Sequence, residues 1–471
     1  MNNLLKAEGL SVINVGLKRF ADDVISQGKE AVKIDWKPLA NGRKDILDAL
    51  DKVDGIKEKV AKANKEVIDR IKKSKPFLED IDLAINVIEG MEKNLILHAG
   101  PYITWDKMCG PMKGAIIGAV LFEGLAASES EAVKLIEGGN IKFAPCHEYN
   151  AVGPMAGVLS ASMPVHIIHD REYDRYSYCS VNEGLGKVLR FGAYSDEVLA
   201  RLSYLKNEFM PVMKKAIKES GGIDIKLITA QALQMGDECH NRNKAATSLF
   251  YKQISLYIVK TESDFEKVQK ALAFIAGNDH YFLNLSMPAC KIMLKAGENI
   301  EYSTIVNVMA RNGVEFGIKV CGLDSKDWYT GASNYIKGLY FPGYSEEDAC
   351  PDIGDSAITE TMGIGGFAMG GAPAIVQFVG GSTDDAIATS KRMYSITTDL
   401  NAAYSLPVLN FKGSALGIDI IKVIENDTLP VINTGIAHKE AGVGQIGAGI
   451  VNPPMECFYN ALLAYVKRYN L

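Results

Sequence analysis

The chain lacks several features that would assign it to a specialised class. Its 471 residues contain no uninterrupted apolar run of the roughly 18 residues that a membrane span needs. Residues 1–9 lack the charged-then-apolar pattern of a signal peptide. The net charge of −6 gives no basic excess, which argues against nucleic acid and anionic membranes as partners. We therefore expect a globular cytoplasmic protein.

Cysteine pairs at disulfide-forming or metal-binding spacing are also missing. The eight cysteines are scattered along the chain, and no two of them form a CxxC pair. This pattern is typical of reduced thiols rather than of a disulfide framework or a zinc site. We predict no metal site and expect no cofactor.

Glycine, by contrast, is abundant, and its densest stretch follows a group of carboxylates. Residues 351–381 place Asp352, Asp355 and Glu360 ahead of five glycines between positions 363 and 371. Glycine at this density is costly in conformational entropy, so it indicates backbone that passes close to a ligand or to other backbone. The glycines alone fit both uses equally, and the carboxylates favour a site. The candidate residues are Asp352, Asp355, Gly365 and Gly366.

Length and hydrophobic periodicity predict an α/β protein of several domains. Residues 1–100 begin with a strand, a helix and a second strand, half of a Rossmann-like unit, and continue with amphipathic helices. Residues 101–194 predict the first part of an α/β core, residues 195–260 a small all-helical domain, and residues 261–471 a glycine-rich α/β core domain. Within these domains, further helices are predicted to begin at Asn182 and to span Ser303 to Arg311.

Dinucleotide binding is only weakly indicated. The first turn has Gly16 but not the other two glycines of the fingerprint, although Asp35 ends the second strand where a ribose-binding acid could lie. The letters of the fingerprint recur from Gly442 to Gly447, but Pro453 follows too soon for a crossover helix. We interpret that segment as a glycine-rich turn.

Polar residues interrupt apolar patterns at two further places. The first follows a predicted strand and holds Cys146, His147, Glu148 and Asn150. The second breaks a helical region and holds Asp237, His240, Arg242 and Asn243. Burying such groups without partners costs about 1 to 3 kcal/mol apiece, so we predict that residues 146–150, 237–243 and 352–371 line one cleft.

Purely structural roles are also possible for these residues. The turn at His147 fits a structural loop, and Asn278 and Asp279 fit helix caps, although His280 is harder to explain in that way. A metal site from Asp237, Glu238 and His240 matches no strong motif, so an anionic-substrate site ranks higher. The cations near these segments are Lys113, Lys187 and Arg190.

Nine segments, in order along nearly the whole chain, resemble one bacterial family. They are VINVG, CGPMKGAIIGAVLFEG, FAPCHEYNAVGPMAGV, NEGLGKVLRFGAY, MGDECHNRN, GNDHYFLNL, ARNGVEFGI, PDIGDSAITETMGIGGFAM and NTGIAHKEAGVGQIGAG. The family (YlbE-like) was once described only as a domain of unknown function. It now includes the G subunit of the oxamate carbamoyltransferase of allantoin degradation.

The resemblance implies a transferase that works with two further subunits, one of them similar to acyl-CoA synthetases. The reaction would convert oxalurate and phosphate, two small anions, to oxamate and carbamoyl phosphate in purine catabolism. Homo-oligomerisation of the chain is also possible.

Such a reaction needs cations and N–H donors for phosphate, a clamp for a carboxylate, and donors for a developing oxyanion. We assign catalytic roles to His147, His280 and Arg242. Substrate binding is assigned to Lys113, Cys146, Glu148, Asn150, Lys187, Arg190, Asp237, His240, Asn243, Asn278, Asp352, Asp355, Gly365 and Gly366. The acids among these would orient the cations and histidines or hold a divalent ion.

Two other functions compete with this one. The chain could be a non-catalytic subunit that binds a small carboxylate for scaffolding, or a nucleotide- or CoA-dependent ligase that uses the N-terminal strand–helix–strand unit. The aromatic residues between Trp328 and Tyr344 fit a partner contact and packing within the domain equally.

Overall fold

The structure, a computed structural model, describes residues 11–34 and 38–471. The chain divides into two compact units, Met1–Asp48 and Ala49–Leu471. In the smaller unit, β1 (Ser11–Val15) and β2 (Glu30–Ile34) pair in parallel and are joined by α1 (Lys18–Ser26). This is the expected strand–helix–strand order, and a complete Rossmann-like arrangement stays a prediction. Asp35 lies outside the described residues.

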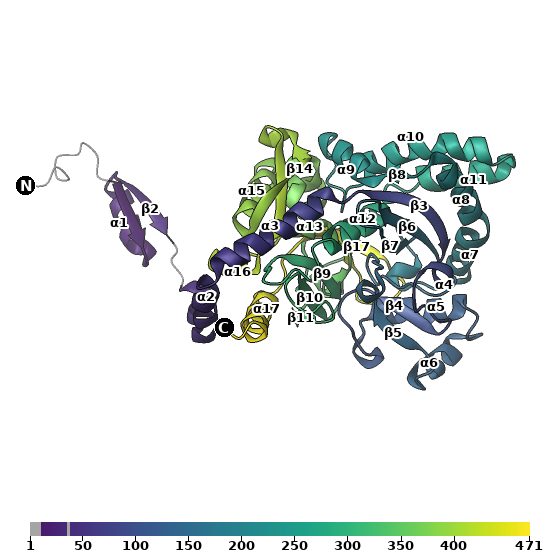
Figure 1. Ribbon diagram of the computed structural model, residues 1–471, viewed down its shortest axis with the longest axis horizontal. Coiled ribbons are helices and arrows are strands. Elements are labelled where there is room, and N and C mark those ends of the chain that lie inside the picture. The colour runs from purple at the N-terminus through teal and green to yellow at the C-terminus, as the bar shows by residue number, and fades with distance from the viewer. Residues whose placement is uncertain (1–10, 35–37) are drawn as a thin grey trace, which may run out of the picture. The chain divides into compact units, whose positions relative to one another are not determined.

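The larger unit mixes helices with several small sheets (Figure 1). Its helices, with α2 crossing from the smaller unit, are α2 (Lys44–Asp54), α3 (Lys57–Lys73), α4 (Ala84–Val87), α5 (Gly110–Phe122), α6 (Glu129–Glu137), α7 (Asp196–Tyr204), α8 (Met210–Ser220), α9 (Ile225–Gln234), α10 (Lys244–Thr261), α11 (Phe265–Ala276), α12 (Leu283–Lys295), α13 (Ile358–Thr361), α14 (Val376–Val379), α15 (Thr383–Met393), α16 (Ile420–Glu425) and α17 (Met455–Arg468). None of the helices among the described residues is both long enough and apolar enough to cross a membrane.

The strands of this unit are β3 (Pro76–Leu83), β4 (Leu95–His98), β5 (Lys142–Pro145), β6 (Pro164–Asp170), β7 (Arg175–Ser180), β8 (Ile223–Asp224), β9 (Val306–Asn312), β10 (Glu315–Val320), β11 (Tyr329–Ala332), β12 (Lys337–Tyr340), β13 (Ile353–Gly354), β14 (Thr397–Leu406), β15 (Lys412–Ile418), β16 (Ile432–Ala437) and β17 (Gln445–Val451). They form sheets in the orders β7-β6-β3-β8, β11-β10-β9-β13, β12-β17-β16, β14-β15 and β4-β5. The α/β class is therefore confirmed. The expected boundaries after residues 100, 194 and 260 all fall inside this one unit, and they stay predictions.

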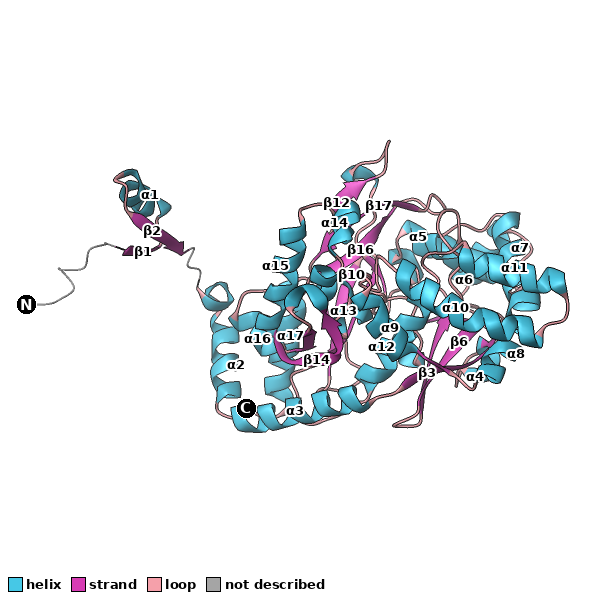
Figure 2. Ribbon diagram, turned by 90° about the horizontal axis from the view of Figure 1, so that it is seen from above, coloured by secondary structure: helices cyan, strands magenta, loops and turns pink. Residues whose placement is uncertain are grey.

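Helix α12 occupies the interior of the larger unit, where it packs on β6, β7 and α13 (Figure 1). Every side chain from Leu283 to Leu294 is buried, including that of Lys291. Helix α3 instead runs along one edge of the unit (Figure 2). A helix that is buried all round has to satisfy each of its polar groups inside the protein. The elements that pack on α12 therefore have to provide hydrogen-bond partners for its polar side chains.

Three local predictions were wrong. The segment predicted as a helix from Ser303 to Arg311 contains β9, which is buried along its whole length. A strand buried on both faces loses its alternating pattern and cannot be told from a buried helix by periodicity. The predicted helix at Asn182 is a loop with one short turn at Leu189–Phe191. Strands β3 and β4 replace part of the amphipathic helices expected within residues 1–100.

Arg311, near the end of β9, anchors the glycine-rich segment. Its fully buried guanidinium donates to both carboxylate oxygens of Asp352, with Nε and Nη2 each 2.7 Å from an oxygen. Its Nη1 donates to the Gly354 carbonyl at 2.8 Å and to Ser356 Oγ at 3.3 Å, and Nη2 also reaches Thr434 Oγ1 at 3.3 Å. One buried cation thus joins β9, β16 and the segment that begins at Asp352.

We expect Arg311→Met to lower the free energy of unfolding by about 3 to 5 kcal/mol, because it leaves the Asp352 carboxylate buried without its partner. The double variant Arg311→Met/Asp352→Leu should regain part of that loss. Urea unfolding measures both. As a control, Lys57→Met disrupts an exposed pair with Asp54 (3.2 Å) and should cost about 1 kcal/mol or less. A similarly small loss for Arg311→Met would contradict the anchoring role.

Candidate functional site

The segment from Asp352 to Gly371 meets both other polar clusters, one at each end. Near its start, Asp355 Oδ1 lies 3.6 Å from His147 Nε2. Further along, Glu360 Oε1 lies 2.8 Å from His240 Nδ1. Residues 146–150 and 237–243 therefore converge on the same segment, but around two polar centres rather than one.

A small cavity lies beside the Glu360 end, and we call it the His240 cavity. It is lined by Pro154, Met155, Leu185, Arg190, Phe191, His240, Asn241, His280, Leu283, Ser356, Thr434, Gly435 and Gln445. The cavity offers about 20 Å³ for the centres of water-sized molecules, enough for about one water. Six chain segments far apart in sequence meet there, and three of the predicted site residues, Arg190, His240 and His280, come together.

His240 and Glu360 form a buried pair at this cavity. The Glu360 oxygens lie 2.8 and 3.0 Å from His240 Nδ1. The same carboxylate accepts from the Gly366 amide at 2.8 Å and from Thr359 Oγ1 at 3.0 Å. A carboxylate on Nδ1 fixes the ring so that Nε2 is free to exchange a proton with a ligand. His240 lines the cavity, so it can serve as a general base there.

The predicted glycines make this pair possible. At Gly365 a Cβ atom would overlap Glu360 Oε1, and the residue has a φ of +59° that favours glycine. At Gly366 a Cβ atom would overlap the Val431 carbonyl. Backbone therefore approaches the carboxylate closely enough to donate a hydrogen bond to it.

Arg190 and His280 add a cation and a neutral imidazole. Arg190 is buried, and its Nη2 donates to the Gly184 carbonyl at 2.5 Å, while its Nε has no partner among the described residues. Burial lowers the pKa of Arg190 to about 10, so it stays charged at neutral pH. Burial, followed by the charge of Arg190, lowers the pKa of His280 to about 4. The site thus offers one guanidinium for an anion and one neutral N–H donor.

Several buried amide groups near this pair also lack partners within the described chain. They are Asn241 Nδ2, Asn243 Oδ1 and both side-chain polar atoms of Asn433. Asn243 donates to the His240 carbonyl at 2.5 Å, and the Asn433 backbone amide lies 3.4 Å from Glu360 Oε1. Unsatisfied buried groups are rare in native proteins, so this concentration indicates a ligand-binding site.

The acids of the 237–243 loop shape the loop itself. Asp237 accepts from the Ala246 amide at 3.0 Å, and Glu238 accepts from the amides of His240 (2.8 Å) and Arg242 (2.6 Å). Burial raises the pKa of Asp237 to about 6 and, together with the charges of Asp237 and Glu360, raises that of Glu238 well above its ordinary range. Within the described residues, no group of three or more His, Cys, Asp and Glu side chains is arranged to hold a metal ion.

The second centre surrounds Asp355. Its two oxygens accept from the backbone amides of Gly100 (2.8 Å) and Gly153 (3.0 Å). Burial raises the pKa of Asp355 to about 7, against the effect of these two bonds and of the charges on Arg311 and Lys291. His147 lies beside it, and neither ring nitrogen has a hydrogen-bond partner among the described residues. We call Asp355, His147, Lys291 and Lys319 the Asp355 centre.

Most of the remaining predicted residues already form hydrogen bonds within the chain. Cys146 Sγ donates to the Gly157 carbonyl at 3.2 Å, and burial raises its pKa well above the usual thiol value. Asn150 accepts from Lys295, and exposed Glu148 accepts from Trp328 Nε1 at 3.3 Å. Asn278 donates to the Asn182 carbonyl at 3.0 Å.

Three predicted cations point elsewhere or lack partners. Lys113 Nζ donates to the Asp106 carbonyl at 3.3 Å and lies 5.5 Å from the Trp105 ring centre. Lys187 is exposed. Arg242 is half-buried, and no hydrogen-bond or ion-pair partner of its guanidinium is found within the described chain, although its charge acts on Asp237. Its catalytic role stays a prediction.

Sequence reasoning missed four residues at these centres. The sequence did not mark Lys291, Arg311 and Lys319 as site residues, because each lies in a mostly apolar segment typical of an ordinary helix or strand. Glu360 stood in the noted carboxylate group but was not assigned to the site. Asp355 lies three residues before the short helix α13, which contains Glu360, and this closeness in the sequence could have placed both acids near the glycines.

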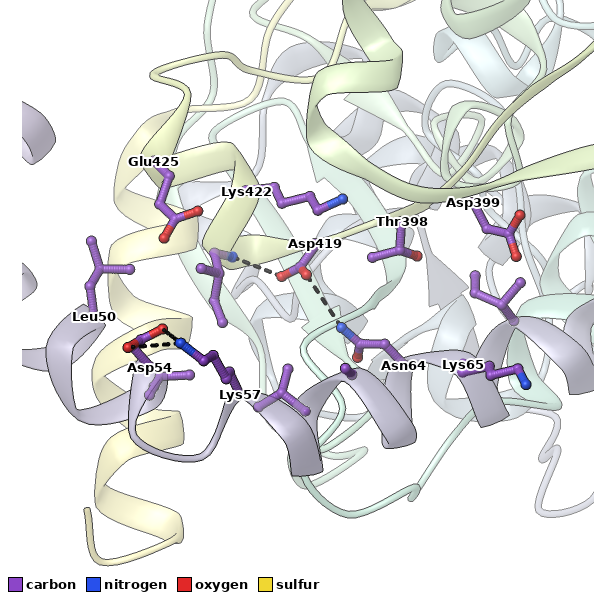
Figure 3. A pocket seen from close by; sticks show the side chains of 15 residues that line it. Leu50, Asp54, Lys57, Asn64, Lys65, Thr398, Asp399, Asp419, Lys422 and Glu425 are labelled. Carbon is purple, nitrogen blue, oxygen red and sulfur yellow. Dashed lines mark hydrogen bonds and ion pairs between the residues drawn. The ribbon is translucent and has the colours of Figure 1, made fainter.

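A separate groove of about 520 Å³ lies between α3 and α16 (Figure 3). Asn64 donates to Asp419 at 3.3 Å across it, and Lys57 pairs with Asp54 at 3.2 Å on its rim. None of the predicted site residues lines it, and these polar groups are already paired. We therefore place the chemistry at the two buried centres.

Two of the comparisons with known proteins name the same family. A family model described as oxamate carbamoyltransferase subunit AllG matches residues 141–356. The chain is 46% identical over 473 residues to the "Uncharacterized protein YahG" of Escherichia coli (strain K12), covering all of both proteins. It is 45% identical over 411 residues to the "Oxamate carbamoyltransferase subunit AllG" of the same strain, covering 87% of this chain and 98% of that protein.

A solved structure is also similar. A crystal structure of a conserved protein of unknown function from Enterococcus faecalis V583 matches with a TM-score of 0.86 and 49% sequence identity. The match covers 87% of this chain and 98% of that chain.

The pKa of Asp355 makes a testable contribution to stability. The folded protein holds this proton up to about pH 7, whereas the ordinary value is 3.8, so the folded state binds more protons between about pH 4 and 7. Stability from this group should therefore fall as the pH rises through that window. We expect the unfolding free energy of Asp355→Asn to decline less steeply over the same range, and urea titrations at several pH values measure the difference. Parallel slopes would contradict the raised pKa.

Proposed function

Because the chain belongs to the family of the oxamate carbamoyltransferase subunit AllG, we propose that it is a subunit of a cytoplasmic carbamoyltransferase and that the His240 cavity carries the transfer. The observation that supports this most strongly is the buried His240–Glu360 pair beside a cavity that also holds Arg190 and His280. These groups match what carbamoyl transfer between two anions requires.

The proposed reaction joins oxalurate and phosphate to give oxamate and carbamoyl phosphate. A phosphate oxygen attacks the carbamoyl carbon, a tetrahedral oxyanion forms, and the bond from that carbon to the oxamate nitrogen breaks. The attacking hydrogen phosphate loses one proton, and the departing nitrogen gains one. No nucleophilic side chain is needed, but a group that moves a proton between these two positions is.

His240 is the residue we assign to that proton transfer. Glu360 holds its Nδ1, so Nε2 can accept the proton from phosphate and return it to the leaving nitrogen. The Glu360 carboxylate would stabilise the imidazolium that forms between the two steps. The arrangement resembles the carboxylate–histidine half of a catalytic triad, with phosphate in the position of the nucleophile.

Arg190 and His280 would hold the anionic groups. A guanidinium binds a carboxylate or a phosphate through two parallel bonds, and Arg190 has an unpartnered Nε for this purpose. The neutral ring of His280 can donate one N–H to the developing oxyanion without adding a charge. Asn241, whose amide nitrogen also lacks a partner among the described residues, offers a second donor.

The cavity must open before substrate binds. Ligand sites usually span about 300 to 1,000 Å³, far more than the 20 Å³ available here. Leu185 lines the cavity but is 54% exposed, and it stands between Gly184 and Gly186, which both have positive φ values. This exposed loop is therefore the part of the wall that we expect to move. A requirement for opening also fits an enzyme whose other subunits complete or stabilise the open site.

The dependence on partners is directly testable. We expect the purified chain to form little or no carbamoyl phosphate from oxalurate and phosphate, and to gain activity when the two other subunits are added. Full turnover by the chain alone would contradict the shared-site proposal. No turnover with both partners would contradict the oxamate assignment and favour a non-catalytic subunit that binds a small carboxylate.

The role of the buried pair is tested by substitution in the active complex. We expect His240→Asn to lower kcat by about 100- to 10,000-fold, the usual size of a general acid–base contribution. Glu360→Gln should lower kcat as well and change the pH profile, because the amide cannot stabilise an imidazolium. Melting temperatures measured alongside separate loss of activity from loss of fold.

The matched control is Lys142→Met. This residue forms an exposed pair with Glu92 at 2.6 Å, and its loss should leave kcat within about twofold. Unchanged kcat in His240→Asn would remove His240 from the mechanism.

A further inference from the structure

We propose that the Asp355 centre is a second binding site, which holds a small oxyanion between Lys291, Lys319 and His147. This proposal is independent of carbamoyl transfer at the His240 cavity. It rests on buried donors whose partners the described residues do not supply.

Lys291 provides the first observation. It lies in the fully buried helix α12 and is 3% exposed. No hydrogen bond or ion pair to its ammonium is found among the described residues. Burial lowers its pKa to about 8, with opposing effects from Glu298 and Asp355 and further lowering by Lys295 and Lys319. It is therefore still mostly protonated at pH 7, and a buried cation of this kind calls for a counter-ion.

Lys319 adds a second ammonium from the neighbouring strand β10. It is 3% exposed, donates to the Ser325 carbonyl at 2.6 Å, and lies 4.5 Å from the centre of the Trp328 ring. One hydrogen bond leaves two of its three N–H groups available. The acids that act on it, Glu148 first, lie beyond ion-pair distance.

His147 supplies a neutral donor and acceptor. It is 4% exposed, and both ring nitrogens lack hydrogen-bond partners among the described residues. Burial, with the charges of Lys291 and Lys319, holds its pKa well below the ordinary value, so the ring stays neutral. Its edge faces Trp328, with ring centres 5.8 Å apart. One ring nitrogen can donate to a ligand while the other accepts.

Together these groups define the chemistry of the ligand. Two ammonium groups and one imidazole N–H call for a ligand with several oxygen acceptors and negative charge. Asp355, 3.6 Å from His147, can carry a proton near neutral pH and then donate rather than repel. All four side chains are buried, so the ligand must be small. Trp328 is partly exposed and covers this centre on the side of exposed Glu148, where a ligand would enter.

The test uses the full chain in a buffer free of oxyanions, with thermal melting and calorimetric titration. Sodium phosphate, sodium bicarbonate and sodium oxamate are compared with sodium chloride at equal ionic strength, which separates inorganic oxyanions from a short carboxylate. We expect at least one oxyanion to bind saturably and raise the melting temperature, and Lys291→Met to weaken that binding at least tenfold. His240→Asn should retain the binding, which distinguishes this site from the proposed catalytic cavity.

Three outcomes would overturn the proposal. They are no binding beyond that of chloride, equal affinity in Lys291→Met, and loss of binding in His240→Asn alone. In chloride buffer, Lys291→Met should melt no lower than the unmodified chain, because methionine keeps most of the volume and removes a buried charge. A large fall in its melting temperature would mean that the protein itself already compensates Lys291, and this too would overturn the proposal. Lys57→Met, which removes an exposed ammonium, is the matched control and should bind normally.

Discussion

The rest of the larger unit depends on how one buried guanidinium is compensated. Arg311 is fully buried, so each of its donors needs an acceptor, and four acceptors come from the single stretch Asp352 to Ser356. This fixes the path of the chain just before α13. Asp355, the acid of one polar centre, lies within that stretch, and Glu360, the acid of the other, lies in α13 directly after it. The positions of both centres therefore follow from the requirement to neutralise Arg311.

The glycines extend the same constraint to the backbone. At Gly354, which has a φ of +125°, a Cβ atom would lie 2.7 Å from the Met155 amide nitrogen. At Gly366 it would overlap the Val431 carbonyl. The close approach at Gly366 brings its amide within 2.8 Å of Glu360 Oε1. Tight packing at the glycine-rich loop thus also places a backbone amide on a buried acid of the proposed site.

The sequence predicted the α/β class and, through a resemblance, the family. It also marked the polar segments, because polar groups in apolar surroundings are recognisable from sequence alone, but it predicted one cleft where the structure has two polar centres. It could not predict the groups whose burial is decided by distant elements. Arg311 was assigned to a helix end, since a wholly buried strand has no alternating pattern. Lys291 looked like an ordinary cation on a helix, and only the packing of α12 on β6, β7 and α13 removes it from water. The predicted roles of Lys113, Lys187 and Arg242 stay predictions.

Burial shifts the pKa values of the interior acids upward and those of the interior bases downward. Burial raises the pKa of Asp237 to about 6 and that of Asp355 to about 7, which reduces negative charge near neutral pH. It lowers the pKa of His280 to about 4, so that ring adds no charge. Arg190 and Lys291, with pKa values lowered to about 10 and 8, remain cations. At the Asp355 centre, a partly protonated acid beside a retained cation leaves a net positive field, and such a field selects anions over neutral ligands of the same shape.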